Sequence, residues 1–436
     1  MPRHATRNSD ESRAGTPHAP APQQIVPSLL AWFAVHARDL PWRRTRDPYA
    51  IWVSEIMLQQ TQVKTVIPYW DRWMRELPTI ESLAVAKPGK IHKLWEGLGY
   101  YTRVRNMQKA AQQIVRLEKQ KAESRKQKGE GRQHRTLNVE HRTLNESDSA
   151  PHNSCQFPTD FDDILGLPGI GRYTAGAIAS IAFNQPAPIL DGNVIRVLTR
   201  LHGIAADPRE KKTNARLWQL AEELVCAAAG DTQHAAPINR EQARNTHEGI
   251  KSKITIKIKN PAAPPCSALN QSLMELGALI CTPRSPSCSA CPVAGNCIAL
   301  RENRVEKIPR PKQRAAVTAR RFLAFVIGRD GRLLVRQRAD GVVNAHLWEF
   351  PNVEAKARDA VAVVVEKHFG VKPRLVEKLC VVKHSITRYR ITTEAHCVSF
   401  DEPCAGVPGV WRTPAQLHKL PFTAAHRRIA MRLGKP

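Results

Sequence analysis

The amino-acid sequence predicts a multidomain chain in which an all-α region is followed by a smaller α+β domain. Apolar residues recur every three or four positions from residue 25 to about residue 117, as in "AIWVSEIMLQQTQVKTVIPYWDRWM", which is the period of amphipathic helices. Four closely spaced cysteines end the helical region. Beyond them, "RFLAFVIGRDGRLLVRQR" contains two β-rich runs about a Gly-Arg-Asp-Gly turn, which predicts a hairpin.

The chain of 436 residues is strongly basic, with a formal net charge of +27 at pH 7. This charge favours a polyanionic partner, because neutralising phosphates supplies most sequence-independent affinity for nucleic acids. The alternative is a basic face that contacts only water. No apolar run approaches the length of a membrane span, and the N-terminal stretch lacks the apolar segment of a secretion signal. We therefore expect no membrane partner and no disulfide framework.

The sequence divides into four segments, the second of which carries two inserts. Residues 1–24 are rich in Pro, Ser and Ala without periodicity, and we expect a disordered tail. The helical domain covers 25–304 with polar inserts at about 118–155 and 229–265, residues 305–318 form a linker, and the α+β domain covers 319–436. The first insert contains "HRTLN" twice and is either an additional DNA-binding arm or a tolerated surface insertion.

The stretch "LPGIGRYTAGA" (167–177) predicts a tight hairpin before a helix. Gly169 and Gly171 allow backbone N–H groups to point outward, and the helix that begins near Arg172 adds the positive end of its dipole. Such a turn binds a phosphate, and it positions a protein on DNA without reading sequence. The pattern is typical of a helix-hairpin-helix motif, and the alternative is an ordinary turn between helices.

The cysteine loop predicts a cofactor. Cys281, Cys288, Cys291 and Cys297 have the spacing C-x6-C-x2-C-x5-C within a single compact loop. Zinc sites usually use two separated CxxC pairs, whereas a compact loop suits a 4Fe-4S cluster. The other six cysteines show no ligand spacing, and we interpret them as ordinary thiols.

Two carboxylates have the properties of a catalytic pair. Glu55 has Ile51, Trp52 and Leu58 as helical neighbours, so it is expected to lose solvation and to have a raised pKa, although a helix glutamate is more often on the surface. Asp191 precedes a helix, where it serves as an N-cap and stays ionised. One proton donor and one fixed anion are what glycosidic bond cleavage requires.

The segments "PWRRTRDPYAIWVSEIMLQQTQVKTVIPYW", "WEGLGYYTRVRN", "LPGIGRYTAGAIASIAF", "LDGNVIRVLTR", "LNQSLMELGALICTPRSPSC" and "CPVAGNC" closely resemble MutY-type adenine DNA glycosylases of the helix-hairpin-helix superfamily. The resemblance covers about residues 25–300 without the inserts. It implies a six-helix barrel and an iron-sulfur module, with adenine flipped out of a pair with 8-oxoguanine. Glu55 matches the acid that protonates adenine N7, and Asp191, beside Asn193, matches the carboxylate that stabilises the sugar cation.

The resemblance also implies roles for other residues. Trp42, Arg43, Leu58 and Gln271 fall where the family surrounds the flipped adenine, whereas Gln60, Thr61, Leu98 and Tyr100 fall where it wedges the duplex and contacts 8-oxoguanine. Inserted side chains help to offset the free energy of base extrusion. Tyr173 stands where the endonuclease III branch has a lysine that forms a Schiff base, so the chain is expected to be a monofunctional glycosylase. Tyr173 either orients Glu55 or a water molecule, or packs as an aromatic residue.

The segments "NAHLWEFPN" and "LPFTAAHRRIA" resemble the Nudix-like domain of the same family. A Nudix hydrolase needs an acidic Mg²⁺-binding box, but "AVAVVVEKHFG" offers only Glu366, so we expect recognition of 8-oxoguanine and no hydrolysis of nucleoside triphosphates. Val382-Lys383-His384 replaces the family's Phe-Ser-His loop, which leaves His384 as the expected lesion contact.

We therefore predict a monomeric base-excision repair enzyme that removes adenine opposite 8-oxoguanine or guanine in double-stranded DNA, and that is cytoplasmic, at the nucleoid, if the source is bacterial. One alternative is an endonuclease III-like pyrimidine or mismatch glycosylase, a branch that lacks the equivalent of Glu55 and has no Nudix-like domain. The other is a non-catalytic iron-sulfur DNA-binding protein, in which changing Glu55 would have no effect.

Overall fold

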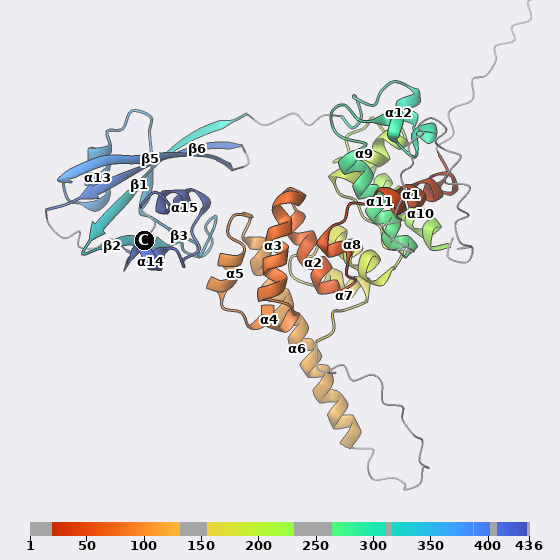
Figure 1. Cartoon of the computed structure of the whole chain (residues 1–436), viewed down its shortest axis with the longest axis horizontal. Helices are drawn as coiled ribbons and strands as arrows, with labels where there is room; N and C mark the ends of the chain where they lie inside the picture. Colours follow the sequence, from red (N-terminus) through yellow and green to blue (C-terminus); the bar gives the residue numbers. More distant parts are fainter. Residues whose placement is uncertain are drawn as a thin grey trace, which may run out of the picture. The chain divides into compact units, whose positions relative to one another are not determined.

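A computed structural model of the chain describes residues 20–130, 155–230, 264–310, 316–386, 388–401 and 408–433. The chain forms two compact units (Figure 1). The first unit comprises Met1–Ile51, Thr159–Leu165 and Gly171–Lys312, and the second comprises Trp52–Pro158, Gly166–Ile170 and Gln313–Pro436. The predicted fold class, a helical region followed by a mixed α+β domain, is confirmed. Most of the predicted N-terminal tail and of both inserts lies outside the described residues.

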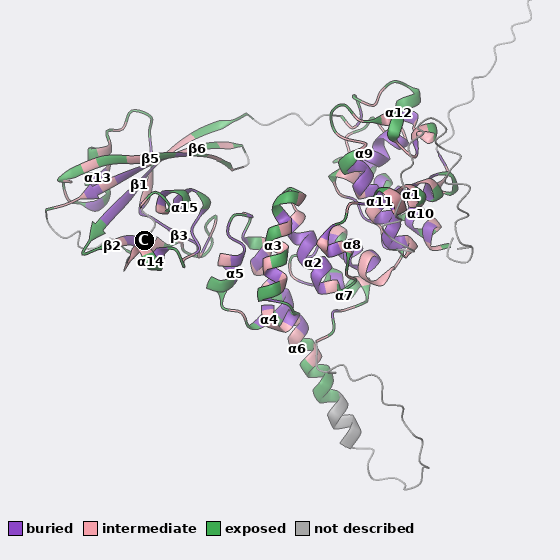
Figure 2. Cartoon of the chain, in the orientation of Figure 1, coloured by how far each residue is buried: buried purple, intermediate pink, exposed green. Residues whose placement is uncertain are grey.

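The first unit is helical and ends with the cysteine loop. Its elements are α1 (Pro22–His36), η1 (Pro41–Arg43), α7 (Phe161–Leu165), α8 (Arg172–Phe183), α9 (Gly192–Leu201), α10 (Lys211–Gly230), α11 (Pro265–Leu279), η3 (Cys288–Ala290), η4 (Ala294–Asn296) and α12 (Ile298–Arg301). Helix α11 is the centre of this unit, since it packs against α1, α8, α9 and α10. Buried residues accordingly follow α8, α9 and α11 in Figure 2.

Helices α9 and α11 approach each other closely because α11 has a glycine at the contact. A Cβ atom on Gly277 would lie 2.6 Å from Cβ of Asn193, which no side chain tolerates without a shift. This close approach brings the start of α9 against the middle of the unit, and Asp191 and Asn193 lie at that start.

The second unit begins within α2 and contains the remaining helices of the helical region. They are α2 (Pro48–Leu58), α3 (Val63–Glu76), α4 (Ile80–Val85), α5 (Pro88–Leu94) and α6 (Thr102–Glu130). Helix α6 continues beyond residue 117, where the helical pattern was expected to stop. Its added residues are mostly Lys, Gln, Glu and Ala, which have high helix propensity and need no buried face to be helical.

The C-terminal part of the second unit is built on a mixed sheet with strand order β3-β2-β1-β6-β5. The strands are β1 (Thr318–Arg329), β2 (Arg332–Gln337), β3 (Trp348–Glu349), β4 (Asn352–Ala355), β5 (Leu375–Ile386), β6 (Tyr389–Ser399) and β7 (Val410–Arg412). Strand β1 pairs antiparallel with β2 and parallel with β6. Asp330 and Gly331 in the β1–β2 turn both have positive φ, as the tight turn of a two-residue hairpin requires, and the predicted hairpin is confirmed.

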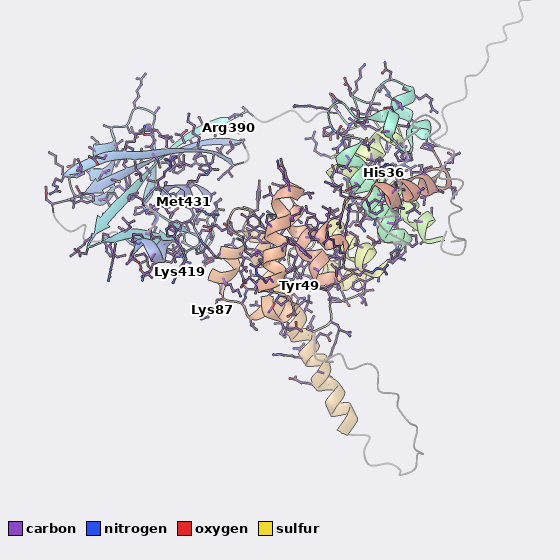
Figure 3. The ribbon with its side chains drawn as sticks, in the orientation of Figure 1. His36, Tyr49, Lys87, Arg390, Lys419 and Met431 are labelled. Carbon is purple, nitrogen blue, oxygen red and sulfur yellow. The ribbon has the colours of Figure 1, made fainter. Side chains whose placement is uncertain are left out.

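Helices cover both faces of this sheet. Helix α13 (Val361–Phe369) packs on one face with Leu323, Phe325 and Ile327, and α14 (Pro414–Leu417) and α15 (Ala424–Ala430) pack on the other face with Ala324 and Val326. The alternation along β1 is the period of a strand buried on both faces. Figure 3 marks Arg390 on β6 and Met431 just after α15, and Met431 is exposed.

In the part of the chain that the structure describes, no helix has the length and apolar character needed to cross a membrane.

Candidate active site

Glu55 lies on α2 among buried residues. Its side chain belongs to a run from Ile51 to Met57 that is buried throughout, and Glu55 itself is only 5% exposed. The interpretation of Glu55 as a solvated surface residue is therefore wrong. A carboxylic acid in such surroundings has lost most of its hydration. The expected rise of its pKa stays a prediction.

Asp191 is the N-cap of α9, as predicted. Its Oδ1 accepts hydrogen bonds from the backbone N–H groups of Asn193 at 3.0 Å and Val194 at 2.7 Å, and its Oδ2 accepts one from Nδ2 of Asn193 at 2.9 Å. Burial raises the pKa of Asp191, while these hydrogen bonds and the nearby Arg196 oppose the rise. The N–H groups donate hydrogen bonds to the carboxylate and Arg196 adds a nearby positive charge, and both favour the charged form of Asp191.

Asn193 connects this carboxylate with the cysteine loop. Its Oδ1 accepts a hydrogen bond from Nη2 of Arg196 at 2.8 Å, and the same nitrogen donates to the Gly277 carbonyl at 2.7 Å. Nε of Arg196 donates to the carbonyl of Cys281 at 2.6 Å. The orientation of the Asn193 amide, and with it the donor to Asp191, is thus coupled to the position of the first cysteine of the loop.

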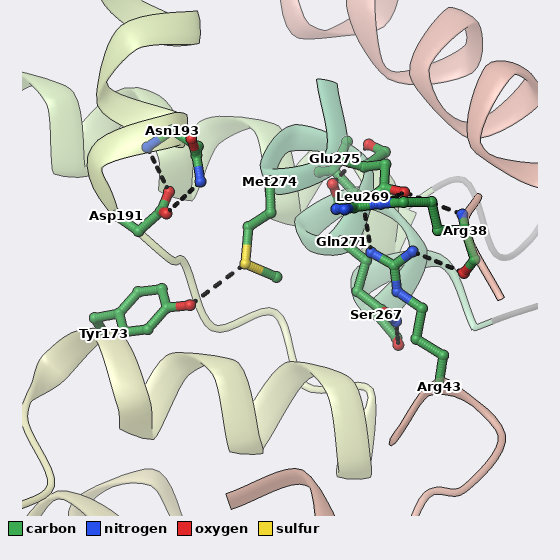
Figure 4. A network of polar contacts seen from close by, with 11 residues as sticks. Arg38, Arg43, Tyr173, Asp191, Asn193, Ser267, Leu269, Gln271, Met274 and Glu275 are labelled. Atoms are coloured by element: carbon green, nitrogen blue, oxygen red, sulfur yellow. Dashed lines mark hydrogen bonds and ion pairs between the residues drawn. The ribbon is translucent and has the colours of Figure 1, made fainter. Parts of the chain in front are cut away.

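Tyr173 lies on the first turn of α8 and points toward α11. Its hydroxyl donates a hydrogen bond to Sδ of Met274 at 3.4 Å, and its ring packs against the buried core of the first unit. Figure 4 shows Tyr173, Met274 and Asp191 on neighbouring segments. These contacts agree with an aromatic packing role, and a role in orienting Glu55 or a water molecule stays a prediction.

A second polar network surrounds Glu275 on α11, whose side chain is almost fully buried. Nη2 of Arg38 donates to its Oε2 at 2.8 Å and Nη2 of Arg43 donates to the same oxygen at 3.0 Å (Figure 4). Although burial alone would raise it, these arginines lower the pKa of Glu275 to about 2. Gln271, one turn earlier on α11, donates to Oγ of Ser267 at 3.0 Å, and Trp42 is buried in η1. The structure thus brings Arg43 of η1 into contact with α11, the helix that also carries Gln271.

The predicted hairpin is present and is followed by α8 at Arg172. Gly169 has a φ of +79°, and a Cβ atom there would lie 2.6 Å from Cβ of Asn106. Gly171 is the N-cap of α8 with extended backbone, and a Cβ atom there would meet nothing within 4 Å. The backbone at Gly171 is therefore open to approach by a phosphate at a helix N-terminus.

The residues expected to wedge the duplex lie on two loops of the second unit. Leu58 ends α2, followed by Gln60, which is exposed, and Thr61. Tyr100 is 49% exposed and follows Leu98, which is only 6% exposed. Burial of Leu98 makes it a support for its loop rather than an open contact surface.

His384 lies on β5 of the C-terminal domain, between the exposed Lys383 and Ser385. It is half-buried, and its Nδ1 is buried without a hydrogen-bond partner within the described residues. Burial lowers the pKa of His384, and the nearby Arg428 lowers it further. A neutral imidazole offers both a donor and an acceptor for a polar ligand.

The cysteine loop is compact and folded by short helical turns. Cys281 lies two residues after the end of α11, Cys288 begins η3, Cys291 is the C-cap of η3, and Cys297 is the N-cap of α12. Burial raises the pKa of the Cys291 thiol to about 11, and the other three thiols of the loop add to the rise because they lie close to it. In the described residues no three His, Cys, Asp or Glu side chains are arranged around a single-ion site. The C-x6-C-x2-C-x5-C spacing of the four cysteines within one compact loop suits a 4Fe-4S cluster.

Arg200 on α9 supports the same assignment. Its side chain is buried, with Nη1 donating to Sγ of Cys281 at 3.3 Å and to the Thr282 carbonyl at 2.7 Å. Its Nε donates to the Ile308 carbonyl at 2.8 Å, so this buried guanidinium donates to two carbonyl oxygens and one cysteine sulfur. Since a buried cation requires a compensating negative charge, the thiolates of an iron-sulfur cluster provide its counter-charge.

Sequence reasoning did not identify Glu275, Arg196 or Arg200. The spacing of Arg196 and Arg200, four residues apart on one helix face and ahead of the cysteine loop, was a signal that could have indicated a basic face toward the cluster. No local pattern marks Glu275, because its arginine partners lie more than 230 residues away in the chain.

The chain matches three protein-family models. Residues 53–223 match the HhH-GPD superfamily of base excision DNA repair proteins, residues 281–297 match the iron-sulfur binding domain of endonuclease III, and residues 323–432 match the NUDIX domain. The chain is also similar to adenine DNA glycosylases from several organisms. The human enzyme is 30% identical over 92% of this chain and 72% of its own length. The enzyme of Buchnera aphidicola subsp. Schizaphis graminum is 33% identical over 76% and 75%, and that of Arabidopsis thaliana 32% identical over 83% and 53%.

Proposed function

The chain belongs to the adenine DNA glycosylase family, and on this basis we propose that it hydrolyses adenine from pairs with 8-oxoguanine or guanine in double-stranded DNA. Its matched cysteine loop holds a 4Fe-4S cluster through Cys281, Cys288, Cys291 and Cys297. When bound, the cluster supplies four iron–thiolate bonds that cross-link the loop and a negative charge beside Arg200. The chemistry at the adenine is carried by side chains.

The observation that carries this proposal is that one carboxylic acid is buried within α2 and a second carboxylate accepts three hydrogen bonds at the N-terminus of α9. We assign the proton donor to Glu55, which is 5% exposed, and the anion to Asp191, whose hydrogen bonds oppose the rise of its pKa that burial causes. Pairs of titratable groups whose environments separate their protonation states are the usual basis of acid and base assignments.

In the proposed reaction Glu55 donates its proton to N7 of the flipped adenine. The bond between the base and the sugar C1′ then breaks, adenine leaves with that proton, and positive charge develops on the sugar. Asp191 stabilises this cation, with Asn193 holding the carboxylate in place through Nδ2. A water molecule adds at C1′ and releases a proton, which leaves an abasic site.

A panel of duplexes tests the substrate. We expect adenine release when adenine lies opposite 8-oxoguanine, slower release opposite guanine, and none opposite thymine. Glu55→Gln should reduce the single-turnover rate by at least about a hundredfold, because it removes the proton donor while binding of the lesion duplex persists. Near-normal turnover of Glu55→Gln would refute the proposed acid, and release of damaged pyrimidines instead of adenine would favour the endonuclease III-like alternative.

Tyr173 bears on whether the enzyme also cuts the strand. A phenol cannot form the imine through which a lysine at this position would promote elimination. We expect an intact abasic site, strand breaks only after alkali or heat, and no efficient trapping on substrate by borohydride. Strand scission without alkali at the rate of base release would show that another amine forms a Schiff base.

We assign lesion recognition to the C-terminal domain. His384 offers a half-buried imidazole next to the exposed Lys383, and Val382-Lys383-His384 stands in place of the family's Phe-Ser-His loop. His384→Ala should lower the ratio of adenine release opposite 8-oxoguanine to release opposite guanine, while the rate opposite guanine changes less. A constant ratio would mean that the helical region alone reads the lesion.

We also propose that the enzyme works as a monomer, because one active site and one flipped base are sufficient for this reaction. In a bacterial source it would act on nucleoid DNA in the cytoplasm. Light scattering of the protein with and without one lesion duplex tests the stoichiometry, and two chains per duplex at saturation would contradict it.

A further inference from the structure

Arg103, on the first turn of α6, donates hydrogen bonds to backbone carbonyls of two separate segments of the second unit: the last turn of α2 with the loop that follows it (the first loop), and the loop before α6 (the second loop). Its Nη1 donates to the Ile56 carbonyl and, at 2.8 Å, to the Gln59 carbonyl. Its Nη2 donates to the Leu98 carbonyl at 3.2 Å and the Gly99 carbonyl at 3.3 Å. The four terminal N–H bonds of the guanidinium are therefore all used, two for each loop.

The backbone of Arg103 adds a fifth hydrogen bond, which is its third to the second loop. Its N–H donates to the Tyr100 carbonyl at 2.9 Å, so that one residue binds the three successive carbonyls of 98, 99 and 100. The guanidinium carbon also lies 5.6 Å from the centre of the Tyr100 ring and 5.4 Å from that of Trp95. Trp95 supports the same loop, since its Nε1 donates to the Gly99 carbonyl at 3.0 Å.

Each of the two loops contains a residue in an unfavourable backbone conformation. Gln60 has a φ of +60° and Tyr100 a φ of +48°, in the left-handed region that is uncommon for residues other than glycine. Such conformations persist only when the surrounding structure holds them, and they concentrate at functional sites. Both side chains are exposed, and Tyr100 is exposed to 49%.

From this geometry we infer that Arg103 is a positioning residue that holds Gln60 and Tyr100 in one fixed arrangement for insertion into the duplex. The inference rests on the proposed function for what the two side chains do, and on the hydrogen bonds of Arg103 for how they are held. A flexible loop would have to be ordered at the moment of binding, whereas a pre-ordered pair of loops avoids that entropic cost. Arg103 touches neither the adenine nor the bond that breaks.

Arginine is required for this arrangement. Two carbonyls on each side need two nitrogens with fixed directions, and the planar guanidinium provides them. Lysine has the same charge but a single nitrogen, so it can reach one loop and not both. Burial lowers the pKa of Arg103 to about 10, so the guanidinium stays charged at neutral pH. A lysine variant therefore keeps the same charge and changes only the number and direction of the donors.

The first test uses the protein without DNA. Arg103→Lys should increase hydrogen exchange at the amides of Leu98 and Thr61 by about tenfold or more, because their loops lose the shared donor. Arg116→Lys is the matched control, since Arg116 is an exposed residue of the same helix. Equal exchange in the two variants would overturn the inference. If Arg103→Lys does not fold, Arg103→Gln, which keeps two N–H donors, replaces it.

The second test uses a lesion duplex with 2-aminopurine beside the 8-oxoguanine. Unstacking by the inserted side chains raises its fluorescence, and this signal does not require base removal. We expect Arg103→Lys to lose most of the increase and to weaken lesion-duplex binding by about tenfold, with Arg116→Lys unchanged. A role in stability alone would lower the fraction of folded enzyme and leave the signal per folded molecule intact, which would overturn the inference.

The two tests separate the inference from the proposed function. If the wild-type protein neither unstacks the duplex nor releases adenine, the proposed function fails, and the exchange experiment still decides whether Arg103 holds the loops. If the wild type does both and Arg103→Lys behaves like Arg116→Lys, the proposed function stands and the inference fails.

Discussion

At the scale of single residues, Asp191 combines two tasks that are usually separate. As an N-cap it satisfies the N–H groups of Asn193 and Val194, and as a carboxylate in a partly buried position it provides a fixed negative charge. The two tasks depend differently on protonation, because only the second needs the charge. Substitution by asparagine therefore separates them.

The raised pKa of Asp191 predicts how Asp191→Asn changes stability with pH. The folded-state pKa lies above the ordinary value of 3.8, so the charged form lowers stability at neutral pH, and this cost disappears as the pH falls through the folded-state pKa. At pH 7 we expect Asp191→Asn to unfold within about 1 kcal/mol of the wild type, because asparagine also caps helices. As the pH is lowered the wild type should gain stability relative to the variant.

Urea unfolding of both proteins at several pH values from 7 down to the ordinary value of 3.8 measures this difference. A relative loss of wild-type stability on acidification would contradict the expected direction of the pH dependence. Adenine release by Asp191→Asn should be lost at every pH, because the anion that stabilises the sugar cation is missing.

Arg200 gives a second prediction at the residue scale. Arg200→Met removes a buried cation that donates to Sγ of Cys281 and to the Thr282 carbonyl, and leaves the cluster charge without its partner. We expect a loss of about 3 kcal/mol in the free energy of unfolding together with less iron per chain. Iron analysis, visible absorbance and urea unfolding measure these effects. Arg301→Met, at an exposed arginine of α12, is the control, and equal iron in both variants would contradict the prediction.

At the scale of elements, the hairpin before α8 contains two glycines with different reasons for being glycine. Gly169 has a φ of +79° and faces Asn106, whereas Gly171 has a φ of −99° and open space where a Cβ atom would lie. The first glycine is therefore needed by the fold, and the second leaves the helix N-terminus accessible to a ligand.

The pair Gly169→Ala and Gly171→Ala tests this distinction. Gly169→Ala should lower the free energy of unfolding by about 1–3 kcal/mol, because alanine is strained at this φ and its Cβ atom would overlap Asn106. Gly171→Ala should unfold like the wild type, while its affinity for any duplex DNA falls because the backbone approaches a phosphate less closely. Thermal unfolding and salt-dependent DNA binding measure the two effects, and equal stabilities would contradict the assignment.

At the scale of the whole molecule, Glu96 joins the helices of the second unit to its sheet domain. The backbone N–H of Phe422 donates to Oε1 of Glu96 at 3.0 Å, and Oε2 pairs with Lys93 at 2.8 Å and with Arg427 at 3.7 Å. Lys93 also donates to the Leu420 carbonyl at 3.2 Å. Because Glu96 is buried, water does not replace its carboxylate as the hydrogen-bond acceptor of these groups.

Removing this carboxylate should uncouple the domain from the helices. Glu96→Ala leaves the Phe422 N–H and the Lys93 ammonium without their acceptor, and we expect a loss of about 1–3 kcal/mol and a separate unfolding transition for the sheet domain in calorimetry. Glu118→Ala, which breaks the surface pair with Lys121 on α6, should change stability by less than about 0.5 kcal/mol. A single transition at the wild-type temperature in Glu96→Ala would contradict the expected role of this joint.

Local patterns in the sequence determined much of this protein. Helical periodicity predicted the burial of Glu55, glycines and a tyrosine marked the hairpin, and the Gly-Arg-Asp-Gly turn predicted the first strand pair. The spacing of the cysteines indicated the cluster before any fold was known. Each of these features lies within one short stretch of chain, at most the 16 positions from Cys281 to Cys297, so a local pattern of residues is enough to indicate it.

The tertiary structure alone decided which distant groups the arginines and Glu96 bind. Arg103 reaches carbonyls 44 and 47 residues earlier in the chain, Arg200 reaches Cys281, and Glu96 receives an N–H from a residue 326 positions away. The periodicity of a helix or strand does not identify the partner of a long charged side chain, because that partner is set by how the elements pack. Periodicity states which face of an element is buried, whereas the identity of the opposing group emerges only when the chain has folded.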